Sequence, residues 1–426
     1  MSSVYLRFIK IYFLIWPALW GILYIYFDIW VDDATPLWLG YLAVWMPSML
    51  LFFAAKYKRG TEKLSPINPT IIRAFLLITF IVAVFDALFL AAAPLVSIVK
   101  LIMMIPSILA LVAAIQYFSS LKREDIANIT ASFSLGMVFY VVLIFPMLPD
   151  YFIRHSADWE TSIVPFFNIR RFTHVVIISI VSGTGYFIYI MKGSRPSEAL
   201  TLKVLIYFCI IFGWTVMFWA GSRAPVLAFS VTMMIFLWRL PSQRIILLMS
   251  CAPAMVIAYF ASGKLHFLNW NRTLSDRLSQ FGSDVNFSNI STLDVNSISS
   301  GRIEVWKAAW TGFLQSPWFG NGYSQYSVVS GISLETPHNF ILEMLHNFGI
   351  VGGVPIIIAL VWTVYSLIKR VFRSPNEPLA LTGGLVVCVM AIQSLVDGVF
   401  ASPYLVFLFS IFAAIAWVAT QKNQHE

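Results

Sequence analysis

Side chains suited to proton transfer and phosphate binding are concentrated between Gly301 and Gly353. This stretch reads GRIEVWKAAW, SPWFGNGYSQY and TPHNFILEMLHNFGIVGG, in a chain of which only 11% is charged. Histidine exchanges protons readily near neutral pH, so His338, at an expected helix start, is a candidate general base. Arginine keeps its charge and binds phosphate oxygens through a planar fork, so Arg302 is a candidate anion ligand. A helix-capping or interfacial role for His338 and a surface role for Arg302 are the alternatives.

Further cations lie upstream, where two expected membrane spans meet. Arg223 follows Gly221 and Ser222 between two apolar runs, and a charge in that position is expensive and commonly functional. Its alternative is a side chain that merely extends to the membrane surface. Arg170, Arg171 and His174 begin another apolar run. They are candidates for a second phosphate contact or for simple surface charge.

Polar residues downstream of His338 follow a helical spacing. On a helix they share one stripe, which either supports His338 and the acceptor path or forms a structural network. They are Asn339, Glu343, His346 and Asn347. Asp397 and Asp86 are expected near the same side of the membrane, where each can orient a base or sugar or pair with a basic neighbour.

The elements that must position these residues are membrane helices. The chain of 426 residues is 59% hydrophobic, and its long apolar runs are typical of helices that cross the hydrocarbon layer. We therefore expect an all-α polytopic membrane protein. About twelve spans are predicted, near residues 8–30, 36–55, 70–91, 94–118, 127–148, 173–191, 202–221, 224–239, 245–261, 349–369, 379–396 and 403–420.

Basic residues alternate from loop to loop in phase with these spans. Such residues collect on the cytoplasmic side, which places both termini in the cytoplasm and explains the excess of 28 Lys and Arg over 20 Asp and Glu without nucleic acid. The cytoplasmic set is Arg7, Lys10, Lys56, Lys58, Arg59, Lys63, Lys122, Arg123, Lys192, Arg195, Lys203, Arg239, Arg244, Lys369, Arg370, Arg373 and Lys422.

One loop on the opposite side is long enough to fold by itself. Three regions are expected: helices 1–9 in residues 1–261, a periplasmic loop domain in 262–348, and helices 10–12 with a cytoplasmic tail in 349–426. Within the loop, GRIEVWKAAWTGFL has helical spacing, and Ile303, Trp306 and Trp310 give it an apolar face suited to the membrane interface. SPWFGNGYS should interrupt that helix as a flexible connection.

Three segments carry a family resemblance. SGRIEVWKAAW, SPWFGNGYSQY and HNFILEMLHNFGIVGG resemble the signature of the O-antigen ligase and polymerase superfamily, which are GT-C-like inner-membrane glycosyltransferases. The ligase pattern, His-Asn followed by two glycines, is met by His338, Asn339, Gly349 and Gly352, and Gly221-Ser222-Arg223 is also similar.

The resemblance implies a metal-independent, inverting transfer at the periplasmic face of the bacterial inner membrane. The donor would be O antigen on undecaprenyl diphosphate, and the acceptor a sugar hydroxyl of the lipid A core. His338 would be the base, with the arginines at the diphosphate. Alternatives are an O-antigen polymerase or a protein O-oligosaccharyltransferase of the same superfamily, and, from another class, a transporter of lipid-linked sugars.

No cofactor or metal is expected from the sequence. HExxH, paired CxxC and Walker motifs do not occur in it. Cys209, Cys251 and Cys388 all fall in expected spans, where they are interpreted as small buried residues.

Overall fold

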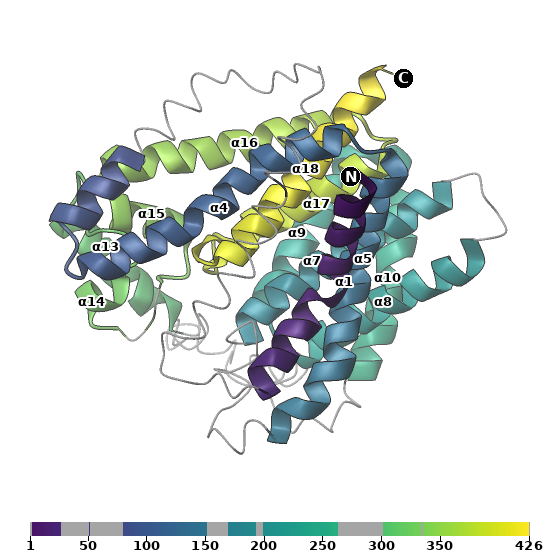
Figure 1. Cartoon of the computed structure of the whole chain (residues 1–426), viewed down its shortest axis with the longest axis horizontal. Coiled ribbons are helices and arrows are strands. Elements are labelled where there is room, and N and C mark those ends of the chain that lie inside the picture. The colour runs from purple at the N-terminus through teal and green to yellow at the C-terminus, as the bar shows by residue number, and fades with distance from the viewer. Residues whose placement is uncertain are drawn as a thin grey trace, which may run out of the picture.

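The computed structural model describes residues 2–26, 51, 80–150, 169–192, 199–262, 301–332, 334 and 336–425, and these contain helices and no strand (Figure 1). Nearly all of the second predicted span (36–55), the first part of the third, and most of the long loop before Gly301 lie outside the described residues. So do five of the basic residues used for the orientation: Lys56, Lys58, Arg59, Lys63 and Arg195.

The helices follow the apolar runs closely. Their bounds are α1 Ser2–Tyr26, α4 Pro94–Ser119, α5 Arg123–Ile144, α7 Ile169–Lys192, α8 Ala199–Trp219, α9 Arg223–Arg239, α10 Arg244–Ser262, α13 Arg302–Gln315, α14 Tyr326–Ser330, α15 Phe340–Phe348, α16 Val354–Arg373, α17 Pro378–Gln393 and α18 Pro403–His425. A further apolar helix is Phe80–Phe89.

Seven of the described segments are long and apolar enough to cross a membrane: Pro94–Ser119, Arg123–Asp150, Ile169–Lys192, Leu200–Trp219, Pro241–Ser262, Phe340–Arg373 and Pro403–Lys422. The chain is therefore a multi-pass, all-helical protein in the part described. The total of twelve spans stays a prediction.

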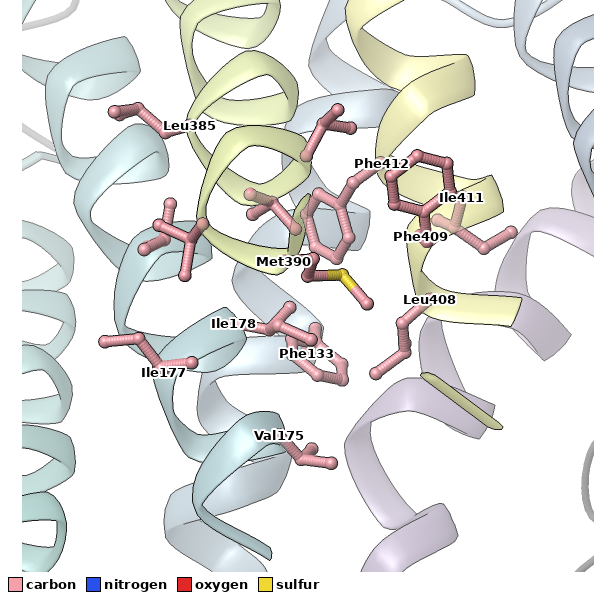
Figure 2. Packing of buried hydrophobic residues seen from close by; sticks show 14 of the residues in the cluster. Phe133, Val175, Ile177, Ile178, Leu385, Met390, Leu408, Phe409, Ile411 and Phe412 are labelled. Atoms are coloured by element: carbon pink, nitrogen blue, oxygen red, sulfur yellow. The ribbon is translucent and has the colours of Figure 1, made fainter. Parts of the chain in front are cut away.

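The central helices pack closely because small residues face one another. A side chain at Gly136 of α5 would collide with the backbone oxygen of Phe13, and one at Gly185 of α7 would collide with Thr382 of α17. Close approach through small residues is how helices associate in lipid, where burial of apolar surface supplies little driving force. Large side chains then fill the remaining space, as Phe133, Ile178, Met390 and Phe412 do in Figure 2.

Antiparallel packing gives the bundle two distinct polar ends. Ser182 donates to the carbonyl of Thr130 at 2.8 Å while Tyr186 donates to Asn128 at 3.4 Å, so α7 runs against α5. At the end where α7 finishes, Lys192 donates to Gln243 at 2.7 Å and Arg123 pairs with Glu377 at 3.5 Å. Ile169, the first residue of α7, lies at the opposite end.

A helical subdomain formed by α13, α14 and α15 lies at one side of the bundle, in green in Figure 1. The predicted helix at 302–315 is confirmed as α13. Its fully buried residues are Val305, Ala309, Gly312 and Phe313. The expected interfacial face is only partly covered, with Trp310 47% exposed.

The glycine-rich connection after α13 is not a flexible link. The backbone of Asn321 donates to the carbonyl of His346 at 2.9 Å, and Gly322 donates to Asn347 at 3.0 Å. Returning bonds run from Ile350 to the carbonyl of Pro317 at 2.8 Å and from Val351 to that of Trp318 at 3.0 Å. We call this pairing of segments 317–322 and 346–351 the clasp. It supplies partners for carbonyls that the end of α15 would otherwise leave unpaired.

Glycine is required where the two segments of the clasp touch. Gly320 has φ +85° and Gly349 has φ +59°, and a side chain on either would meet backbone atoms of the other segment at 2.5 Å or 2.4 Å respectively. Gly352 and Gly353 have the packing role predicted for them, against Val82 and the Met344 backbone. The glycines of the sequence signature therefore build the scaffold rather than hold a ligand.

Candidate active site

The carboxylate of Asp397 is the centre of a polar cluster at the end of the bundle where α7 begins. Its Oδ2 lies 3.1 Å from Nε2 of His174, and its Oδ1 lies 3.2 Å from Nδ1 of His338. Arg302 approaches the same Oδ2, with its terminal nitrogen 3.9 Å away. Asp397 is 3% exposed, so its charge acts in a poorly solvated setting where electrostatic interactions are strong.

The turn after α17 brings Asp397 to His338. The side-chain amide of Asn339 donates to the carbonyl of Leu395 at 2.8 Å, and the backbone of Phe340 donates to that of Ser394 at 2.8 Å. Asn339 also caps α15, because its side-chain oxygen accepts from the backbone of Leu342 at 3.0 Å. One asparagine thus begins the helix and anchors it beside the acid.

His338 itself is held in an unusual backbone conformation. Its φ is +54°, a left-handed value that is uncommon for a side-chain-bearing residue and is often found at functional sites. Its Nδ1 lies 3.2 Å from Oδ1 of Asp397 as an ion-pair contact without good hydrogen-bond geometry, and its Nε2 is buried with no hydrogen-bond partner among the described residues. With Nδ1 turned to Asp397, this nitrogen is the one available to a substrate proton.

Three arginines surround this cluster, each in the first turn of a helix. Arg170 is the second residue of α7, Arg223 the first of α9 and Arg302 the first of α13. Burial lowers the pKa of Arg302, Asp397 opposes that effect, and repulsion from Arg170 and Arg223 lowers it further. Arg302 is therefore within electrostatic reach of both other cations, and all three residues lie in the first turn of helices whose N-termini also favour an anion.

The charge state of Asp397 follows from its neighbours. Burial alone would raise the pKa of its carboxyl, but the charges and hydrogen bonds of His174 and His338 hold that pKa well below its usual range. The acid is therefore ionised at neutral pH. Because an ionised carboxylate can only accept, Nε2 of His174 carries the proton in their contact.

Of the predicted site residues, the structure brings six together: Arg170, His174, Arg223, Arg302, His338 and Asp397. Asn339 supports them through the turn after α17. Arg171 follows Arg170 on α7, turned by about 100° around the helix. Its role stays a prediction.

The polar stripe on α15 divides between two environments. Glu343 is one turn from Asn339 and 4% exposed. His346 is 0% exposed, contacts the side-chain oxygen of Asn347 at 3.2 Å and packs edge-on against Tyr326. His346 lies six residues after Phe340, the first residue of α15, about 9 Å of rise along the helix axis, and it packs between α15 and α14 rather than joining the cluster.

Gln393 and Asp86 are among the buried polar residues whose side chains have no hydrogen-bond partner within the described part of the chain. Gln393, one turn before Asp397, is 0% exposed, and neither of its amide atoms has a hydrogen-bond partner among the described residues. Gln393 is not among the site residues predicted from the sequence, although a polar glutamine in an apolar span is itself a signal of function. Asp86 is also 0% exposed, and its carboxylate has no partner within the described part of the chain. It is therefore not shown to orient the site.

The described residues contain no group of three or more histidine, cysteine or acidic side chains placed to hold a metal ion. The three cysteines are buried and free. The arrangement can instead accept a proton at Nε2 of His338, stabilise the resulting imidazolium through Asp397, and bind a polyanion at the arginines.

Two comparisons with known proteins match parts of this chain. Residues 208–357 match the family model described as O-antigen ligase. A segment of 251 residues is 24% identical to the teichuronic acid biosynthesis protein TuaE of Bacillus subtilis (strain 168), covering 56% of this chain and 47% of the relative. The chain thus spans about half the length of the curated relative it matches. The family match contains Arg223, Arg302 and His338, whereas Arg170, His174 and Asp397 lie outside it.

Proposed function

We propose that this chain, which carries an O-antigen ligase domain and belongs with that superfamily, transfers glycan from undecaprenyl diphosphate to a sugar hydroxyl of the lipid A core. The observation that carries the proposal is the placement of a buried, unpartnered Nε2 of His338 beside Asp397 and Arg302, an arginine that is close enough to Arg170 and Arg223 to be repelled by both. Such a site combines a proton acceptor with a receptor for a leaving diphosphate.

The transfer is a single displacement. Nε2 of His338 takes the proton of the acceptor hydroxyl as its oxygen bonds to the anomeric carbon. The bond from that carbon to the diphosphate oxygen breaks, and its electron pair leaves with undecaprenyl diphosphate. Because no covalent enzyme intermediate forms, the configuration at the anomeric carbon is inverted. Asp397 lies 3.2 Å from Nδ1, where it stabilises the imidazolium until the proton passes to solvent.

The arginines bind the charge that develops on the departing diphosphate. Arg223 and Arg302 are the principal ligands, and Arg170 and Arg171 serve the second phosphate. Arginine is suited to this because its planar donors match phosphate oxygens bidentately. Lysine at Arg223 keeps the charge and loses the fork, so undiminished turnover by Arg223→Lys would argue against bidentate binding there.

The site lies on the periplasmic side of the inner membrane, with both termini in the cytoplasm. Support comes from the helix directions, which separate the site from the polar end containing Lys192 and Arg123. Basic residues favour the cytoplasmic side. Undecaprenyl-linked donor and lipid-anchored acceptor then both reach the site through the bilayer.

The test uses purified full-length protein with lipid-linked glycan and lipid A core. We expect His338→Ala to lose about 10²–10⁴-fold in transfer rate, the usual contribution of a positioned general base, while its melting profile still shows a folded protein. The wild-type protein should remain active after treatment with a divalent-metal chelator. Full transfer by folded His338→Ala would overturn the assignment.

A polymerase of the same superfamily is the second candidate, because the relative's name refers to the biosynthesis of a polysaccharide, teichuronic acid, and to no lipid A core acceptor. The two differ in acceptor: a polymerase extends another lipid-linked repeat. A deletion strain distinguishes them. Loss of a ligase leaves polymer on undecaprenyl diphosphate and bare lipid A core, whereas loss of a polymerase leaves core capped by a single repeat. A protein O-oligosaccharyltransferase would leave lipopolysaccharide unchanged.

A further inference from the structure

Two potential hydrogen-bond donors, His174 and Arg302, lie near the same oxygen of Asp397, Oδ2. Nε2 of His174 lies 3.1 Å from Oδ2, whereas the guanidinium of Arg302 lies 3.9 Å from the same atom. An arginine and a carboxylate in direct contact normally approach to about 2.7–2.9 Å and pair through two parallel bonds. Arg302 therefore forms a long ion pair with Asp397 and not a close, hydrogen-bonded one.

His174 is held firmly where it lies. It is 2% exposed and belongs to α7, one turn after Arg170. Close contact between Gly185 and Thr382 fixes α7 against α17, the helix that leads to Asp397. The second ring nitrogen of His174, Nδ1, is buried with no hydrogen-bond partner among the described residues. Its described polar contact is with Asp397.

The other charges around Arg302 would drive it toward the acid. Arg170 and Arg223 repel its guanidinium, and Asp397 attracts it. The Nε of Arg302 is buried and has no hydrogen-bond partner in the described chain. The guanidinium group therefore has at least one N–H donor without an acceptor. A close ion pair between Arg302 and Oδ2 would compete with the contact that His174 already makes with that atom at 3.1 Å.

We propose that His174 is a positioning residue that occupies Oδ2 of Asp397 and thereby keeps Arg302 available for the diphosphate of the donor. The inference rests on the proposed function, because it assumes that Arg302 binds a diphosphate. Without His174, Arg302 pairs with Asp397, and the site loses one of its anion ligands while keeping all of its arginines.

The experiment measures binding of undecaprenyl diphosphate to the full chain in detergent, without any acceptor or transfer step. His174→Ala should weaken binding about tenfold, the scale expected when one charge-assisted hydrogen bond is lost. His174→Gln should bind as tightly as wild type, since its side-chain amide reaches about as far as Nε2 and donates to the same oxygen. Equal binding by His174→Ala and wild type would overturn the proposal.

A second substitution separates diversion of Arg302 from general damage. In His174→Ala/Asp397→Asn the neutral amide no longer captures Arg302, so binding should return toward the wild-type value. A double variant as weak as His174→Ala, or a His174→Gln variant as weak as His174→Ala, would show that His174 acts only as packing. Failure of the wild-type protein to bind undecaprenyl diphosphate would instead contradict the proposed function.

Discussion

At the scale of single residues, the site depends on one ionised acid in a buried position. The carboxylate of Asp397 makes ion-pair contacts with His174 and His338. It also accepts a hydrogen bond at Oδ1 from the backbone N–H of Gly398, at 3.0 Å. A buried carboxylate is tolerated only when such partners replace water. Stability and catalysis therefore both depend on its charge.

Asp397→Asn should reduce transfer by about 10²–10⁴-fold, since the imidazolium of His338 loses its counter-charge. The folded-state pKa of Asp397 lies below its usual value, so ionisation contributes stability above about pH 4 that is lost as pH falls toward the lowered pKa. The melting-temperature difference between wild type and Asp397→Asn should therefore be present at pH 5 and shrink at lower pH. A difference independent of pH in this range would contradict the prediction.

The backbone of His338 allows a separate test of strain. Its φ of +54° costs an ordinary residue about 1–2 kcal/mol, whereas glycine adopts it freely. We expect His338→Gly and His338→Ala to be equally inactive but His338→Gly to be the more stable, by about 1 kcal/mol. Thermal unfolding of the two variants measures this, and a more stable alanine variant would mean that the conformation is not strained.

At the scale of elements, the clasp determines where α15 ends and how α13 is held beside it. Its four backbone hydrogen bonds join segments 317–322 and 346–351, and Gly312 of α13 lies directly against the ring of His346. Movement of one segment must therefore move the other. The site helices are parts of one packed unit.

Gly320→Ala should destabilise this unit by about 1–3 kcal/mol, because the added carbon meets the Asn347 backbone and the φ of +85° is unfavourable for alanine. Gly331→Ala is the matched control. That glycine also has a positive φ, +69°, but no atom lies within 4 Å of the added carbon. The lowering of the melting temperature should be clearly larger for Gly320→Ala, and equal effects would argue against tight contact at the clasp.

The sequence predicted elements better than contacts between them. Apolar runs predict membrane spans, because a helix in lipid must satisfy its own backbone hydrogen bonds. His338, Arg223 and Arg302 could be identified as candidates because charged residues make up only 11% of the chain. The pairing of His174 with Asp397 joins residues 223 positions apart, and no local pattern encodes it. The glycines and proline of the clasp predict a break in the helix, and so a flexible link. They do not reveal the backbone contacts that fix this segment against residues 346–351.

At the scale of the whole molecule, the two polar ends should face opposite sides of the membrane. A cysteine at Gln315, exposed on α13, should react with a membrane-impermeant maleimide in cells whose inner membrane is intact. A cysteine at Ser242, exposed at the other end, should react only after that membrane is permeabilised. The native cysteines are buried and give a low background. The reverse labelling pattern would contradict the proposed orientation.

The position of Arg302 near Arg170 and Arg223 bears on how stable the protein is in the cell when no ligand is bound. The repulsion between Arg302 and these two residues is a cost that the empty protein bears and that a bound diphosphate removes. A ligand that binds only the folded state stabilises it in proportion to the logarithm of its concentration. Under the proposed function the donor lipid also stabilises the protein that binds it, and a cell that stops making donor should degrade this protein faster.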